Sequence, residues 1–145
     1  MTSRSILVGP LILLVAALCM AQQVEVKNVP IKYVSPLSGE KMYLSYCAAC
    51  HGTDGRGTGP AATAMKTQPA DLTTLAKSHG GVFPKLHVSN TILGDTAAPQ
   101  AHGSKDMPVW GSLFPSLCGG RPTAKAETQM RASNLTDYVE SLQQK

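Results

Sequence analysis

Apolar residues near the end of the chain recur with the period of a helix. Between positions 126 and 143 they recur at intervals that place them on one side of an α-helix. The inward stripe predicted for this helix is Met130, Leu135, Tyr138, Val139 and Leu142. A shorter helix is predicted over 84–93, because Pro84 suits a first turn and Gly94 suits a helix end. No stretch alternates apolar and polar residues over a useful length, so no β-strand is predicted.

A positively charged residue and an apolar run open the chain. Arg4 precedes the apolar residues 6–20, and Ala21 is the small residue that signal peptidases favour. The run is short for a membrane span, which takes about 20 residues, although a retained anchor and lipidation at Cys19 stay open. The predicted organisation is a signal peptide at 1–21, an extended segment at 22–36 and one compact domain at 37–145.

The sequence Cys-Ala-Ala-Cys-His, which ends at His51, follows a helix predicted to begin near Ser38. Two cysteines three positions apart lie on one side of a helical turn, within reach of the two vinyl groups of one porphyrin. His51 follows directly and is carried beneath the ring, where its imidazole can bind iron. The motif therefore predicts one covalently attached c-type haem per chain, bound through Cys47 and Cys50, with His51 as an iron ligand.

Two other kinds of site use a Cys-x-x-Cys pair. A thioredoxin-like dithiol needs a strand that leads into the motif and βαβ units around it, and neither is predicted here. A structural zinc site needs two further ligands at matched spacing, and the chain has no second pair of this kind. Cys118 is left without a partner, either as a buried thiol or as one half of an intermolecular disulfide.

The sequence Met-Pro-Val-Trp-Gly at 107–111 supplies the candidate for the sixth ligand of the iron. Met107 lies in a predicted loop, and the proline after it lacks an amide hydrogen and stiffens that loop. A thioether is soft and neutral, and it raises the reduction potential relative to a second histidine. Trp110 is expected to pack beside the porphyrin. The competing ligands are Met65, His79, His87 and His102.

These pieces, in this order, resemble the small class I monohaem c-type cytochromes of bacterial periplasms. The resemblance rests on Gly39 with Tyr43, CAACHG with the GTGP run that ends at Pro60, MPVWG, and the helix over 131–142. It implies an all-α cytochrome c fold, with three to five short helices around one covalent haem c. It also implies a close helix crossing at Gly39 and Tyr138, and a carbonyl of Pro60 that accepts a hydrogen bond from Nδ1 of His51. The segment 72–102 is longer than in the shortest members of this family, so the resemblance says less about one haem edge.

The resemblance implies an electron-transfer protein rather than an enzyme: a one-electron carrier of a bacterial respiratory chain, with His51 and Met107 bound in both oxidation states. Its partners would be redox proteins and its location the periplasm, with membrane association through an anchor or a partner complex left open. Two alternatives also stay open: a subunit of a larger membrane redox complex, and a catalytic or sensing haem domain with a displaceable sixth ligand. Lys and Arg outnumber Asp and Glu by only 13 to 9, and there is no basic run, so nucleic-acid binding is not expected.

Overall fold

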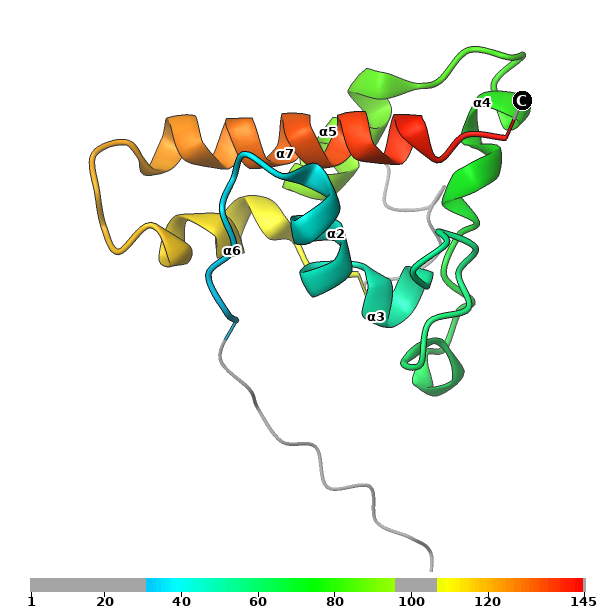
Figure 1. Cartoon of the computed structure of the whole chain (residues 1–145), viewed down its shortest axis with the longest axis horizontal. Helices are drawn as coiled ribbons and strands as arrows, with labels where there is room; N and C mark the ends of the chain where they lie inside the picture. Colours follow the sequence, from blue (N-terminus) through cyan, green and yellow to red (C-terminus); the bar gives the residue numbers. More distant parts are fainter. Residues whose placement is uncertain (1–30, 96–106, 145) are drawn as a thin grey trace, which may run out of the picture. The chain divides into compact units, whose positions relative to one another are not determined.

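The computed structural model describes residues 31–95 and 107–144 (Figure 1). The predicted signal peptide and His102 lie outside this range. The described residues contain helices and no strand, which confirms the all-α prediction. They form six α-helices where three to five were expected, because α3 and α4 are separate four-residue turns. The elements are α2 Gly39–Tyr46, α3 Ala48–His51, η1 Ala62–Ala64, η2 Leu72–Thr74, α4 Leu75–Ser78, α5 Lys85–Leu93, α6 Trp110–Leu117 and α7 Ala124–Ser141, where η1 and η2 are 3₁₀-helices.

The longest helix, α7, packs against α2, α5 and α6 (Figure 1). Its buried face consists of Thr128, Arg131, Ala132, Leu135, Thr136 and Val139, which recur at the spacing of one helix face. The prediction for Leu135 and Val139 is confirmed, but the one for Met130 is wrong, because that side chain is 43% exposed. The neighbouring Arg131 takes the inward position instead and is fully buried.

Helix α2 crosses α7 at Gly39. The side chain of Ser38 caps the helix by accepting a hydrogen bond from the amide of Lys41 at 3.2 Å. A β-carbon on Gly39 would overlap the carbonyl oxygen of Asn134, so only glycine lets the two backbones approach this closely. The rings of Tyr43 and Tyr138 pack across the same crossing, with centroids 5.1 Å apart. The predicted crossing is therefore confirmed.

Helix α5 confirms the prediction over 84–93: it begins after Pro84 and ends at Gly94, whose φ of 79° lies in the left-handed region. Helix α6 was not predicted. Its sequence WGSLFPSL contains Gly111 and Pro115, two residues that disfavour helices. Close packing against α5 offsets the low helix propensity of these residues. A β-carbon on Gly111 would overlap the carbonyl oxygen of Leu93, so the glycine lets the start of α6 lie directly against the end of α5.

Residues 31–36 lie against α2 and α7 without forming a helix. The carbonyl of Val34 accepts a hydrogen bond from Arg131 at 2.7 Å, and the carbonyl of Pro36 accepts one from Asn134 at 2.7 Å. The compact unit accordingly begins at Ile31. Within the described range, no helix has the length and apolar character needed to cross a membrane.

Candidate haem-binding site

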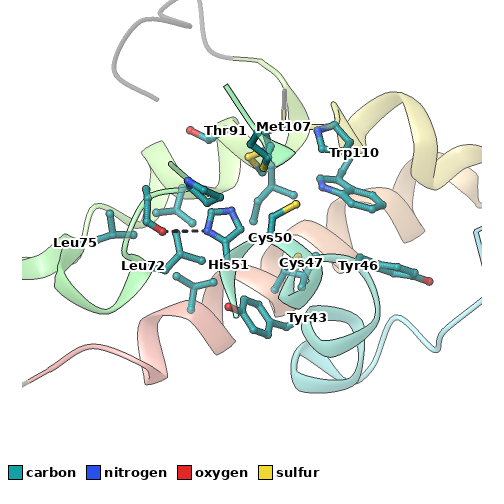
Figure 2. A pocket seen from close by; sticks show the side chains of 18 of the residues that line it. Tyr43, Tyr46, Cys47, Cys50, His51, Leu72, Leu75, Thr91, Met107 and Trp110 are labelled. Carbon is teal, nitrogen blue, oxygen red and sulfur yellow. Dashed lines mark hydrogen bonds between the residues drawn. The ribbon is translucent and has the colours of Figure 1, made fainter. Parts of the chain in front are cut away.

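The junction of α2 and α3 places the cysteine–histidine motif beside one pocket. Cys47 ends α2 by donating its amide hydrogen to the carbonyl of Tyr43 at 2.8 Å, and the next turn begins immediately after it. The amide of His51 donates to the carbonyl of Cys47 at 2.9 Å. Figure 2 shows Cys47, Cys50 and His51 together at the edge of this pocket. The structure therefore brings the three predicted residues of the motif to one cavity.

The pocket is large and apolar. It is lined by residues of α2 and α3, the segment 65–75, α5, the segment 107–110 and α7. The space between them measures about 990 Å³ when the open solvent at its mouth is included. Among the residues that the structure describes, no Asp, Glu, Lys or Arg lines the pocket. A flat, largely apolar group fits such a site, and a highly charged ligand does not.

The imidazole of His51 is oriented by the backbone. Its Nδ1 lies 3.1 Å from the carbonyl oxygen of Ala70 (Figure 2). Because a carbonyl can only accept, Nδ1 carries the proton and Nε2 keeps the lone pair that a metal ligand needs. Burial lowers the pKa of His51, and the smaller effect of the Ala70 carbonyl opposes this, so the ring is neutral at pH 7.

Pro60 does not accept this hydrogen bond, contrary to the prediction. The chain after the motif turns back over α3: the amide of Gly59 donates to the carbonyl of Cys50 at 3.0 Å, and the amide of Ala61 to that of Ala49 at 2.8 Å. This path leaves Pro60 exposed behind α3, outside the lining of the pocket. Residues 68–70 bring the chain back to the imidazole of His51. The carbonyl of Ala70 accepts the hydrogen bond from Nδ1 there.

Glycines in the loop after His51 let residues 69–70 approach the loop closely. Gly57 has a φ of 75°, and a β-carbon there would overlap the carbonyl oxygen of Pro69. The amide of Gly57 donates to the carbonyl of His51 at 2.8 Å. The buried hydroxyl of Tyr43 donates to the carbonyl of Gly52 at 2.7 Å. The backbone on both sides of the histidine is thus fixed by hydrogen bonds.

Cys47 and Cys50 are not joined to each other by a disulfide, and their surroundings differ from those of a dithiol oxidoreductase. Burial, and to a smaller extent Cys50, raise the pKa of Cys47 to about 12. Redox-active Cys-x-x-Cys sites instead lower the pKa of the attacking thiol, because the thiolate is the nucleophile. Cys118 is a free thiol, buried at the end of α6 and away from the pocket lining.

The family comparison agrees with this geometry. The family model described as "Cytochrome C oxidase, cbb3-type, subunit III" matches residues 35–116, which is more than half of the chain. The chain belongs to this family of c-type cytochromes. No curated protein and no solved structure matches it. The cytochrome binds haem c covalently, as predicted, with Cys47 and Cys50 at the spacing that thioether attachment requires, and it functions in haem-based electron transfer.

Met107 and Trp110 of the cytochrome also line the pocket (Figure 2). Trp110 is 6% exposed, and its ring lies 5.2 Å from that of Tyr46 and 5.4 Å from that of Phe114. Met107 comes from the segment that leads into α6, whereas His51 comes from α3. The two candidate ligands therefore reach one pocket from different parts of the fold.

The competing ligands separate into two groups. Met65 lines the pocket, as Met107 does. His79 and His87 do not line it; His79 is exposed and its Nδ1 lies 2.8 Å from the carbonyl of Leu75. In the described ranges, His51 is consequently the histidine of the pocket, with two methionines as candidates for the sixth position.

The sequence interpretation missed Ala70 and the polar side chains of the pocket. Thr67, Gln68 and Thr91 lie along the lining, and the hydroxyl of Thr91 donates to the carbonyl of His87 at 2.8 Å. Ala70 acts through a backbone atom that every residue possesses, so its side chain gave no signal. The proline before it, Pro69, is the one local hint of a rigid segment.

Proposed function

We propose that this cytochrome is a one-electron carrier in which His51 and Met107 would hold the haem iron. The observation that carries the proposal is the shared pocket: the oriented imidazole and the thioether both line it, and the other lining residues in the described part of the chain are uncharged. Both ligands are neutral, so the site adds no charge of its own to either oxidation state of the iron.

The haem iron, when bound, takes up and releases one electron. His51 supplies a nitrogen whose proton is held on the other side of the ring by Ala70. Met107 supplies a soft sulfur ligand, which favours the reduced iron relative to a second histidine. Leu135 and Val139 of α7 line the pocket with apolar surface and keep water from it. His51 and Met107 would together leave the haem iron no open site for a substrate, which supports a carrier over an enzyme.

The proposed setting is the periplasm, in a respiratory chain, with redox proteins as partners. Support comes from the export signal predicted at 1–21 and from the attachment chemistry of c-type haem. A second candidate function is a haem subunit of a membrane-bound terminal oxidase, and the family's description favours it. Osmotic release of the periplasm separates the two: a free carrier leaves with the soluble fraction, and an oxidase subunit stays with the membranes.

The ligand assignment is tested by substituting the two methionines of the pocket. Ferric haem bound by a thioether has a weak far-red absorption band, which should disappear in Met107→Ala and persist in Met65→Ala. The two variants make the same chemical change in the same pocket, so Met65 is a matched control. The opposite pattern would assign the sixth position to Met65, and the absence of the band from the unmodified protein would rule out a methionine ligand.

A further inference from the structure

We propose that Gln143 and Gln144, at the end of α7, are positioning residues for His51. They act through the backbone segment that carries the carbonyl of Ala70. The inference rests on the proposed role of His51 as an iron ligand, and it assigns to the end of α7 a part in setting the reduction potential.

The side chain of Gln143 is hydrogen-bonded to the segment that follows Ala70. Its Oε1 accepts a hydrogen bond from the amide of Ala76 at 2.9 Å. Its Nε2 donates to the carbonyl of Leu72 at 2.6 Å and to the carbonyl of Val139, within α7, at 2.9 Å. One side chain thus joins both ends of the turn 72–76 to the last turn of α7, and Figure 1 shows the end of α7 beside α4.

Gln144 makes a second connection to the same turn. Its amide donates to the carbonyl of Thr73 at 2.9 Å, and its Nε2 donates to the hydroxyl of Thr73 at 2.9 Å. Thr73 is 5% exposed, and its amide and hydroxyl both donate to Asp71, at 2.8 and 2.6 Å. Asp71 is the residue directly after Ala70. A continuous chain of hydrogen bonds therefore links α7 to the neighbour of the histidine's acceptor.

The other attachments of this segment lead back to the loop of His51 itself. The amide of Leu72 donates to the carbonyl of Gly55 at 2.7 Å, and the side chain of Gln68 donates to the carbonyl of Gly57. Gly57 is bonded in turn to the carbonyl of His51. These contacts join the segment to the haem-binding loop itself, whereas the two glutamines join it to α7.

The consequence concerns the strength of the bond between Ala70 and His51. A carbonyl that accepts from the outer nitrogen of an iron-bound imidazole raises the basicity of the ligand and favours the oxidised metal. If the hydrogen bonds of Gln143 and Gln144 are lost, the carbonyl of Ala70 is held less firmly and its effect on the basicity of His51 weakens. The cytochrome should then favour the reduced state and show a higher reduction potential.

The test is a redox titration of the full-length holoprotein carrying Gln143→Leu or Gln144→Leu. We expect Gln143→Leu to move the equilibrium toward the reduced form by about threefold or more, where tenfold corresponds to about 59 mV for one electron. Gln144→Leu should move it less, in the same direction. Gln129→Leu makes the same change at an exposed position of α7 and should leave the potential unchanged. Gln143→Glu keeps the acceptor for Ala76 and should give an intermediate shift.

Hydrogen exchange distinguishes the loss of the Gln143 hydrogen bonds from the effect of that loss on the haem. The amide of Ala76 should exchange faster in Gln143→Leu than in the unmodified protein, because its acceptor is gone. Faster exchange with an unchanged potential would overturn the inference, and so would an equal shift in Gln129→Leu. If Gln143→Leu does not fold, Gln144→Leu tests the inference in its place, and an unchanged potential in that variant would overturn it. Failure of the proposed function would look different, since the unmodified protein would then lack the far-red band of a thioether ligand.

Discussion

The segments around His51 and Met107 reach the same pocket, but different interactions hold them. Around His51 the backbone is fixed by hydrogen bonds from Gly57, Tyr43 and the ring itself, which bonds to Ala70. The neighbouring cysteines add covalent attachment to the haem. Directional hydrogen bonds and thioethers thus hold this side of the site, and they fix the orientation of the imidazole.

The Met107 side is held by packing. Val109 lies against the backbone of Gly94, where a β-carbon would overlap it. Trp110 stacks on Phe114, with an angle of 29° between the ring planes, and packs against Tyr46. Apolar contacts are less directional than hydrogen bonds and adjust to small shifts. The histidine side therefore fixes the haem, while the methionine side is the one that sequence changes can tune or release.

The largest effect should come from removing the covalent attachment. Cys47→Ser combined with Cys50→Ser should abolish covalent haem, because serine cannot form the thioethers. Haem-dependent peroxidase staining of a denaturing gel, or the mass of the intact protein, checks this. Cys118→Ser is the control and should keep its haem, since that thiol does not line the pocket. Covalent haem in the double variant would contradict the assignment of the motif.

Two glycines allow the two sides to be perturbed separately. Alanine at Gly39 would overlap Asn134 and push α2 away from α7, and alanine at Gly111 would overlap Leu93 and push α6 away from α5. Each should lower the free energy of unfolding by about 2 kcal/mol, the usual cost of overpacking. Denaturant unfolding of the two holoproteins measures this.

The two variants should differ in the spectrum of the haem. Gly111→Ala displaces the helix that begins three residues after Met107, so the far-red thioether band should weaken. Gly39→Ala changes the packing of the histidine side, where hydrogen bonds and thioethers hold the ligand, so the band should persist. Equal loss of the band in both variants would mean that the two sides are not held independently.

The smallest effect should come from a buried ion pair beneath α6. Arg131 donates to Glu127 at 2.7 Å and lies over the ring of Phe114 at 5.7 Å. The hydrogen bond from Arg131 lowers the pKa of Glu127 below its usual value, although burial opposes this. A lowered pKa stabilises the fold above the value of about 4.3 for the unfolded chain, and this stabilisation is lost as the pH falls through the lowered pKa.

Glu127→Gln should therefore cost about 1.5 kcal/mol at neutral pH, because glutamine still accepts one hydrogen bond from the buried cation. The difference in Tm between the two proteins should shrink as the pH falls below about 4. Thermal unfolding at several pH values checks this. A difference in Tm that stays constant from neutral to acidic pH would contradict the role of the ion pair.

Residues whose side-chain type carries the chemistry could be predicted from the sequence. The spacing of Cys47, Cys50 and His51 indicates haem attachment by itself. The capped helices α2 and α5 follow from Ser38 and Gly94 in the same way. In each case a local rule links the residue type to its role without knowledge of the distant contacts.

Features that depend on distant contacts could not be predicted. The acceptor for His51 is a backbone oxygen of Ala70, and only the path of the glycine loop decides between it and Pro60. Arg131 breaks the rule that inward positions are apolar, because Val34 and Glu127 satisfy its charge. Helix α6 contains helix-breaking residues and depends on its packing against neighbouring helices.

Carbon monoxide binding to the reduced, unmodified cytochrome at neutral pH tests most directly whether His51 and Met107 close the haem site. A haem iron closed by His51 and Met107 has no free position, so the visible spectrum should stay unchanged when the gas is added. Met107→Ala opens that position and should show rapid binding under the same conditions. Rapid binding by the unmodified protein would contradict a closed haem site and favour a ligand-binding or catalytic haem domain.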